Sequence, residues 1–261
     1  NPVTSAIFAL ALFVLWQHQR HLTYVGLLAL GFALKSLAYL AQFATLGEYV
    51  ALARVVSNSL FMATAVLIVG SVIARYDQRP PYRAMSLIGF VSIVVLSFYQ
   101  VVDENYAARV IALNLGIAVI SAIGVSKLYR VVRKTFVERF LILILVLHFA
   151  GALFRPTLLL GSGDPSTMSI ESVYWLGVTA SDIIMSLLLV LCVLTGVALD
   201  LFAKLRIESI QDSLSHLLNR RGFEETANLH LLSAVGRPEP AALVLADLDH
   251  FKAINDTYGH A

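Results

Sequence analysis

The chain has 261 residues, of which 58% are hydrophobic and only 14% are charged, and its mean hydropathy is +0.78. A soluble domain usually carries about 25% charged residues, so this composition places most of the chain in a membrane. The net charge of +2 is too small to indicate nucleic-acid binding, and a single cysteine, Cys192, excludes an intramolecular disulfide.

Seven apolar segments follow one another along the first 200 residues. A membrane-spanning helix needs about 20 mainly apolar residues. The segments that reach or approach this length are residues 3–17, 22–45, 50–74, 82–102, 105–130, 136–160 and 172–202. The first is short enough for a signal peptide, but it lacks a basic start and a small-residue cleavage site, which favours a helix trimmed at its N-terminus. The sequence therefore predicts a mainly α membrane protein with a bundle of seven transmembrane helices over residues 1–203.

The connections between these segments alternate in charge. Residues 17–21, 75–83 and 130–134 carry the basic side chains, and Lys204 and Arg206 follow the last segment. The other connections hold no Lys or Arg, and their charged residues are Glu48, Asp103, Glu104, Asp164 and Glu171. Because cytoplasmic loops collect Lys and Arg, we expect a multi-pass protein of the cell inner membrane, with its N-terminus outside and its C-terminus in the cytoplasm.

A short amphipathic stretch leaves the last apolar segment. Ile207, Ile210, Leu214 and Leu217 are spaced three, four and three residues apart, with polar residues between them. This spacing is that of a coiled-coil seam, so residues 204–218 are predicted to form a signalling helix that pairs with its copy in a dimer. An amphipathic helix that packs on its own domain is the alternative.

The last part of the chain carries a pattern of acidic and polar residues. An apolar run over residues 241–246 is typical of a buried central strand, and Asp247 follows it directly. An acidic side chain where a strand gives way to a loop commonly holds Mg²⁺ against nucleotide phosphates. The alternative for Asp247 is an ordinary carboxylate at a strand end. The chain then stops at Ala261, and we expect this to lie in the middle of a domain.

Two sequence blocks resemble the diguanylate cyclase, or GGDEF, family. Its opening pattern, DxLTGLxNRRxF, is matched by Asp212, Leu214, Leu217, Asn219, Arg220, Arg221 and Phe223. Ser215 replaces the threonine of the pattern and keeps its hydroxyl, whereas His216 replaces its glycine and changes how the turn closes. The second pattern, DxDxFKxxNDxxGH, is matched throughout, so residues 212–261 are expected to be the start of an α/β GGDEF domain.

The resemblance implies an activity and a set of site residues. Asp247 and the backbone carbonyl of Leu248 would bind Mg²⁺ or Mn²⁺, Asn255 would pair with a guanine edge, and His260 would lie near the substrate. Lys252 is a candidate phosphate contact, although a plain surface lysine is an equal alternative. The family joins two GTP molecules into cyclic di-GMP across a homodimer and releases two pyrophosphates. Its signature loop lies beyond Ala261, so a degenerate GGDEF domain that acts as a binding or docking module is the alternative function.

Several ionisable or polar residues lie inside the predicted spans, where they are costly and usually functional. They are Lys35, Arg54, Asn58, Arg109, His148, Arg155 and Asp182. Three arginines against one aspartate favour a small anionic ligand in a cavity open to the outside, since Arg binds carboxylates bidentately. The alternative is that Asp182 pairs with one arginine as a structural contact while the outer arginines reach lipid headgroups.

Three other functions fit less well. A haem needs two facing histidines, and only His148 lies deep in a span. A retinal protein needs a buried lysine, and Lys35 on the second segment is an unusual place for it. A transporter is disfavoured by an odd helix count without a visible inverted repeat. The sequence therefore predicts a membrane-bound receptor that controls cytoplasmic diguanylate cyclase activity, with GTP and a second copy of the chain as partners.

Overall fold

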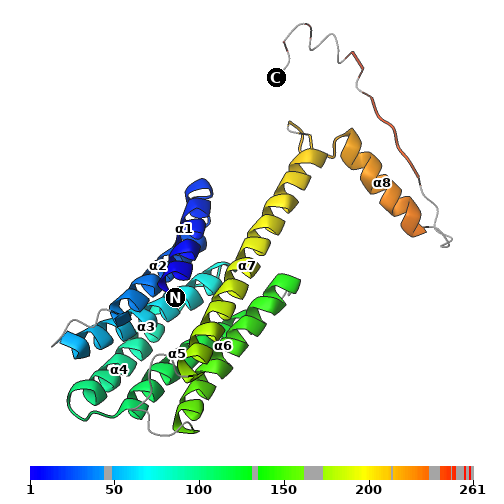
Figure 1. Ribbon diagram of the computed structural model, residues 1–261. Coiled ribbons are helices and arrows are strands. Elements are labelled where there is room, and N and C mark those ends of the chain that lie inside the picture. Colours follow the sequence, from blue (N-terminus) through cyan, green and yellow to red (C-terminus); the bar gives the residue numbers. More distant parts are fainter. Residues whose placement is uncertain are drawn as a thin grey trace. The chain divides into compact units, whose positions relative to one another are not determined.

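The computed structural model describes residues 1–43, 49–130, 135–161, 173–212, 214–234, 242–247, 249–250, 256 and 259. The chain divides into two compact units, Asn1–Ala198 and Leu199–Ala261. Its helices are α1 (Pro2–His18), α2 (Thr23–Phe43), α3 (Val50–Ala74), α4 (Tyr82–Val101), α5 (Tyr106–Tyr129), α6 (Phe136–Gly161), α7 (Val173–Ile210) and α8 (Arg220–Ala234) (Figure 1).

The first unit is a helical bundle in which successive helices from α1 to α6 pack against each other. Contacts join α1 to α2, α2 to α3, α3 to both α4 and α5, α4 to α5, and α5 to α6. Among the described residues, six helices, α2 to α7, are long and apolar enough to cross a membrane, whereas α1 is apolar but has only 17 residues. The predicted helices are therefore observed, and six of them reach the length of a span.

Small residues let three helices approach closely in the centre of the bundle. A Cβ atom built on Gly116 of α5 would lie 2.3 Å from Ser92 Oγ of α4 and 2.8 Å from the methyl carbon of Met62 of α3. The outer face of α4 is apolar instead, with Leu87, Phe90 and others exposed. An apolar exterior suits contact with lipid tails, because no polar surface has to be desolvated there.

Helix α7 has 38 residues, which corresponds to about 57 Å at 1.5 Å per residue. The hydrocarbon core of a bilayer is about 30 Å thick, so α7 is much longer than a span needs. Its part in the first unit buries Ser186, Leu189, Val190, Val193 and Val197, a set with helical spacing. From Leu199 to Ser209 its side chains are exposed.

The second unit corrects two sequence predictions. Helix α7 ends at Ile210, so Leu214 and Leu217 lie in the following turn and do not extend the predicted coiled-coil seam. The predicted strand over residues 241–246 is not observed, because residues 242–247 have no regular secondary structure and Leu243, Val244 and Leu245 are exposed. A strand forms when a neighbouring strand supplies hydrogen-bond partners, and no described residue does so here.

Candidate functional site

The turn between α7 and α8 is organised by Asn219. Its backbone N–H donates to Ile210 O over 2.9 Å, and its side-chain Nδ2 donates to Ser209 O, also over 2.9 Å. Its Oδ1 accepts from the N–H of Gly222 over 2.9 Å, which satisfies one of the free donors at the start of α8. One asparagine therefore ties the end of α7 to the beginning of α8, which explains its place in the family's opening pattern.

His216 lies where the family pattern has glycine, and its backbone adopts a conformation that favours glycine. Its φ of 57° lies in the left-handed region, which costs about 1–2 kcal/mol for a residue with a Cβ atom. Three residues after Asn219, a Cβ on Gly222 would lie 2.2 Å from Ile210 O, so no larger residue fits there without a backbone shift. Histidine in place of the pattern's glycine therefore strains the backbone at position 216, but the turn still closes.

Asp212 is the second polar residue that holds this turn. Its Oδ1 accepts from the N–H and the hydroxyl of Ser215, both over 2.8 Å, and from the N–H of Leu214 over 3.2 Å. These donors stabilise the carboxylate and lower the pKa of Asp212 below its usual value, with the Ser215 backbone as the largest cause. The serine that replaces the pattern's threonine therefore keeps the hydroxyl function.

The predicted nucleotide residues lie mostly outside the described residues. Leu248, Lys252, Asn255 and His260 fall there, and Asp247 is described as exposed. Within the described part of the chain, no three His, Cys, Asp or Glu side chains gather to hold a metal ion. The carboxylate of Asp247 has the oxygen donors that Mg²⁺ prefers, so its chemistry fits the ion although a metal-binding geometry is not described.

A charged cluster lies between α2 and α7 in the first unit. Lys35 Nζ donates to Asp182 Oδ1 over 2.8 Å and to Ser186 Oγ over 2.7 Å. The other carboxylate oxygen, Oδ2, accepts from the Tyr39 hydroxyl over 2.7 Å. The side chains of Lys35 and Asp182 are only 8% and 17% exposed, so this ion pair is largely shielded from the surroundings. Asp182 thus pairs with a lysine, whereas the sequence alternative paired it with an arginine.

Arg155 and His148 of α6 extend this cluster. Arg155 is close enough to Asp182 and Tyr39 for an electrostatic interaction, but it donates no hydrogen bond to any of the described residues. His148 Nδ1 lies 3.0 Å from the hydroxyl oxygen of Ser121 on α5. Lys35 and Arg155 are positively charged and Asp182 is negatively charged, so this group carries one excess positive charge when His148 is neutral.

Two of the remaining predicted sensory residues, Arg54 and Arg109, form a separate group. Arg109 donates to Gln100 Oε1, its guanidinium lies 5.1 Å from the Tyr106 ring centroid, and Arg54 is its electrostatic neighbour. Asn58 is half-buried on α3. The seven predicted residues therefore do not make one constellation: Lys35, His148, Arg155 and Asp182 are grouped, and Arg54 and Arg109 lie together elsewhere.

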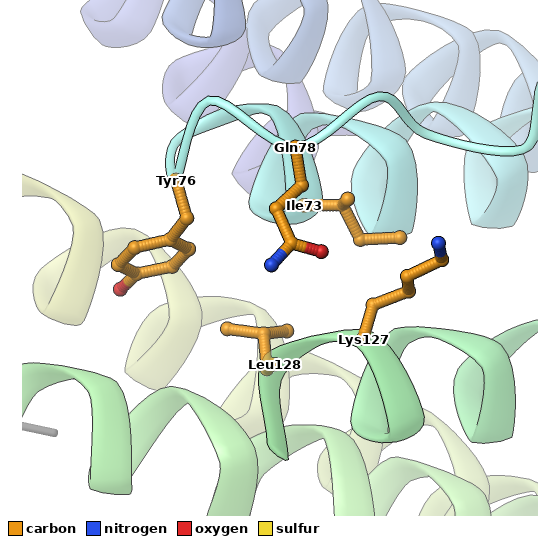
Figure 2. A pocket seen from close by; sticks show the side chains of 5 residues that line it. All are labelled: Ile73, Tyr76, Gln78, Lys127 and Leu128. Atoms are coloured by element: carbon orange, nitrogen blue, oxygen red, sulfur yellow. The ribbon is translucent and has the colours of Figure 1, made fainter. Parts of the chain in front are cut away.

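The sequence interpretation missed the role of Arg75, which it assigned to a basic loop. Arg75 donates to the Tyr24 hydroxyl over 2.6 Å, and its guanidinium fills the space where a Cβ on Gly196 of α7 would lie. Beside it, Ile73, Tyr76, Gln78, Lys127 and Leu128 line a small hollow between the end of α3 and the end of α5 (Figure 2). Burial raises the pKa of Tyr76 to about 12. The hollow is too narrow to hold a water molecule in this structure.

Comparison with known proteins places the end of the chain in one family. Residues 209–261 match the family described as diguanylate cyclase, GGDEF domain. This segment contains the turn held by Asn219 and Asp212, as well as Asp247. It follows the helical unit and is a GGDEF-domain sequence, as the two motif blocks predicted. No solved structure matches the chain significantly.

The curated relatives match a part of the chain of similar length. The chain is 40% identical over 58 residues to diguanylate cyclase VdcA of Vibrio cholerae, which covers 22% of this chain and 16% of VdcA. It is 41% identical over 58 residues to the probable diguanylate cyclase DgcE of Escherichia coli, covering 22% of this chain and 5% of DgcE. The cyclic di-GMP phosphodiesterase NbdA of Pseudomonas aeruginosa is 45% identical over 58 residues, covering 22% of this chain and 7% of NbdA. The chain therefore spans at most about a sixth of the length of these relatives.

Proposed function

We propose, from the GGDEF-domain sequence of residues 209–261, that this chain belongs to a membrane-bound receptor that controls the synthesis of cyclic di-GMP from two GTP molecules. The observation that carries the proposal is this match at the C-terminal end of a helical unit with six helices of spanning length. Relatives named as diguanylate cyclases support the reaction, and the apolar helices support a membrane location.

The orientation of the protein follows from its connections. The basic residues that follow α1, α3, α5 and α7 belong in the cytoplasm by the positive-inside rule, and we propose that α1 is the seventh span despite its 17 residues. The N-terminus then lies outside and the GGDEF segment lies inside the cell, where GTP is present. Cytoplasmic placement is a requirement of the proposed reaction.

The proposed chemistry assigns roles to the residues that match the second motif. Asp247 and the Leu248 carbonyl would hold Mg²⁺, which would neutralise charge on the phosphates when bound. Asn255 pairs with the guanine edge, and Lys252 and His260 contact the substrate. The 3′-hydroxyl of each GTP attacks the α-phosphorus of the other, and each attack releases one pyrophosphate. Because the two GTP molecules must face each other, two copies of the domain form one active site.

Helix α7 is the element that connects sensing to catalysis in this proposal. It carries Asp182 in the first unit, and its last residue, Ile210, accepts the N–H of Asn219 in the turn that opens the GGDEF segment. A ligand that alters the contacts of Asp182 would act on the same helix that ends at this turn. We propose a small anion as that ligand, because the group of Lys35, Arg155 and Asp182 has excess positive charge, and Arg54 with Arg109 offers a second cationic group.

The experiment measures cyclic di-GMP formation from GTP by a form of the protein with a complete GGDEF domain. Asp247→Asn should abolish synthesis, because an amide does not bind Mg²⁺ as a carboxylate does. Glu208→Gln, at an exposed site on α7, is the control and should retain the wild-type rate. Unchanged synthesis in Asp247→Asn would contradict the metal assignment.

A second candidate function is a GGDEF domain that has lost catalysis and acts as a binding or docking module. One relative, NbdA, is named a cyclic di-GMP phosphodiesterase, whereas the relatives named diguanylate cyclases support the first candidate. Proteins with different named activities therefore each match 22% of this chain. The two candidates are separated by the same assay: a docking module would bind GTP or cyclic di-GMP but form no product even with every motif residue intact.

A further inference from the structure

A groove between α5 and α6 is not used by the proposed reaction or by the charged cluster. It has a volume of about 500 Å³. Its lining comes from Ala122, Val125, Ser126, Tyr129 and Arg130 on α5 and the turn after it, and from Val146 and Phe149 on α6. The lining is therefore mainly apolar, with Ser126 as an exception, and becomes polar and basic where α5 ends.

The groove extends over most of the depth of one lipid leaflet. From Ala122 to Arg130 the axis of α5 advances about 12 Å, at 1.5 Å per residue. Half of a bilayer's hydrocarbon core is about 15 Å thick. Since α5 ends at Tyr129, the basic end of the groove lies at the end of a span, and its apolar part extends along the helix toward the middle of that span.

The end of the groove carries side chains that suit a charged headgroup. Arg130 is exposed and forms no ion pair with the described residues, so its guanidinium is available to a ligand. Guanidinium groups bind phosphate oxygens bidentately. Tyr129 is 71% exposed at the same level, which is the position that aromatic residues favour at a membrane interface.

From this charge complementarity we propose that the groove between α5 and α6 binds an anionic phospholipid, with one acyl chain against Val125, Val146 and Phe149 and the headgroup phosphate at Arg130. The occupant is a lipid because the lining is mainly apolar over most of the depth of one leaflet and a cation, Arg130, lies at its end. This proposal concerns a different surface from the ion pair of Lys35 with Asp182 and does not depend on the proposed reaction. An anionic lipid in this groove would contact both α5 and α6 and stabilise their packing.

The test measures lipid retention by the purified chain in detergent with native mass spectrometry. Phosphatidylglycerol and phosphatidylcholine with identical acyl chains are titrated separately, and wild type should retain phosphatidylglycerol about fivefold more tightly, as expected for one basic residue. Arg130→Gln should remove this preference, and Arg130→Lys should keep most of it. Arg83→Gln removes an exposed arginine at the start of α4 and is the matched control, which should keep the preference.

A second variant tests the apolar part of the site. Val125→Phe adds volume to the groove and should weaken retention of both lipids, while circular dichroism shows that the helices are retained. Soluble glycerol phosphate should not compete, because it lacks the acyl chains. Equal retention of the two lipids by wild type, an unchanged preference in Arg130→Gln, or equal loss in Arg83→Gln would overturn the proposal. It would also be overturned if Val125→Phe separated a dimer and left lipid retention unchanged, since the groove would then hold a second copy.

Discussion

Lys35 of α2 and Asp182 of α7 form an ion pair 2.8 Å long between residues that are 147 positions apart in the sequence. Ser186 and Tyr39 complete it, so each charged group has a second hydrogen-bond partner. Burying two charges is costly, and the attraction between them compensates only when the geometry is good and the remaining hydrogen bonds are made. This pair meets both conditions and fixes α2 against α7.

Breaking the ion pair from one side should destabilise the chain. Asp182→Asn leaves Lys35 as a shielded charge without its counter-ion, which typically costs about 3–5 kcal/mol. Reversible unfolding of the purified chain in mixed detergent micelles measures this loss, with Asp103→Asn as the exposed control for the same substitution. The double variant Lys35→Met, Asp182→Leu should recover much of the stability. Equal stability of Asp182→Asn and Asp103→Asn would show that the pair contributes nothing.

The turn between α7 and α8 should depend on Gly222 much more than on His216. Gly222→Ala places a Cβ atom 2.2 Å from a backbone oxygen that cannot move alone, so the turn must open. His216→Gly relieves about 1–2 kcal/mol of strain, because glycine adopts the left-handed conformation without a steric cost. It also costs about 0.5–1 kcal/mol, because glycine loses more conformational entropy on folding. The stability of the turn should therefore be unchanged or slightly higher.

Hydrogen exchange of the amides in residues 209–223 distinguishes the two variants. Exchange should be faster in Gly222→Ala, because the bonds of Asn219 to Ile210 and Gly222 are lost. It should be no faster in His216→Gly. Identical exchange in the two variants would mean that the close approach of Gly222 to α7 does not hold the turn together.

The proposed orientation predicts which connections face the outside of the cell. A cysteine at Asp103, between α4 and α5, should react with a membrane-impermeant thiol reagent on intact cells, and a cysteine at Arg79, between α3 and α4, should not. Both positions are exposed, and the buried Cys192 is first replaced by serine. Labelling at Arg79 with protection at Asp103 would place the GGDEF segment outside the cell, where the proposed reaction has no substrate.

The sequence was sufficient to predict the apolar helices of the first unit and which of their residues carry charge. Long apolar runs predict spans because a bilayer requires about 20 such residues, and six helices of that length are observed. Lys35 and Asp182 were both identified as costly charges in spans. Their pairing was not predicted, because the 3.6-residue period shows which residues share a face of one helix but not which helix that face meets.

Local patterns failed where the outcome depends on contacts with other parts of the chain. The apolar run over residues 241–246 predicts a strand, but strand formation requires a partner strand that the described residues do not supply. The spacing from Ile207 to Leu217 predicts a coiled coil, but the hydrogen bonds of Asp212 and Asn219 end α7 at Ile210. The asparagine and aspartate were recognised as motif residues, whereas their role in closing this turn required the structure.

The central claim is that the helical unit controls a cyclase, and the rate of cyclic di-GMP synthesis in membranes tests it most directly. Wild type, Asp182→Asn and Asp103→Asn are compared in a form of the protein with a complete GGDEF domain, at equal protein levels and saturating GTP. We predict that Asp182→Asn changes the rate about fivefold or more, the usual range of coupling between distant sites, while Asp103→Asn does not. An unchanged rate in Asp182→Asn, in a protein whose loss of stability shows that the ion pair is broken, would contradict the claim.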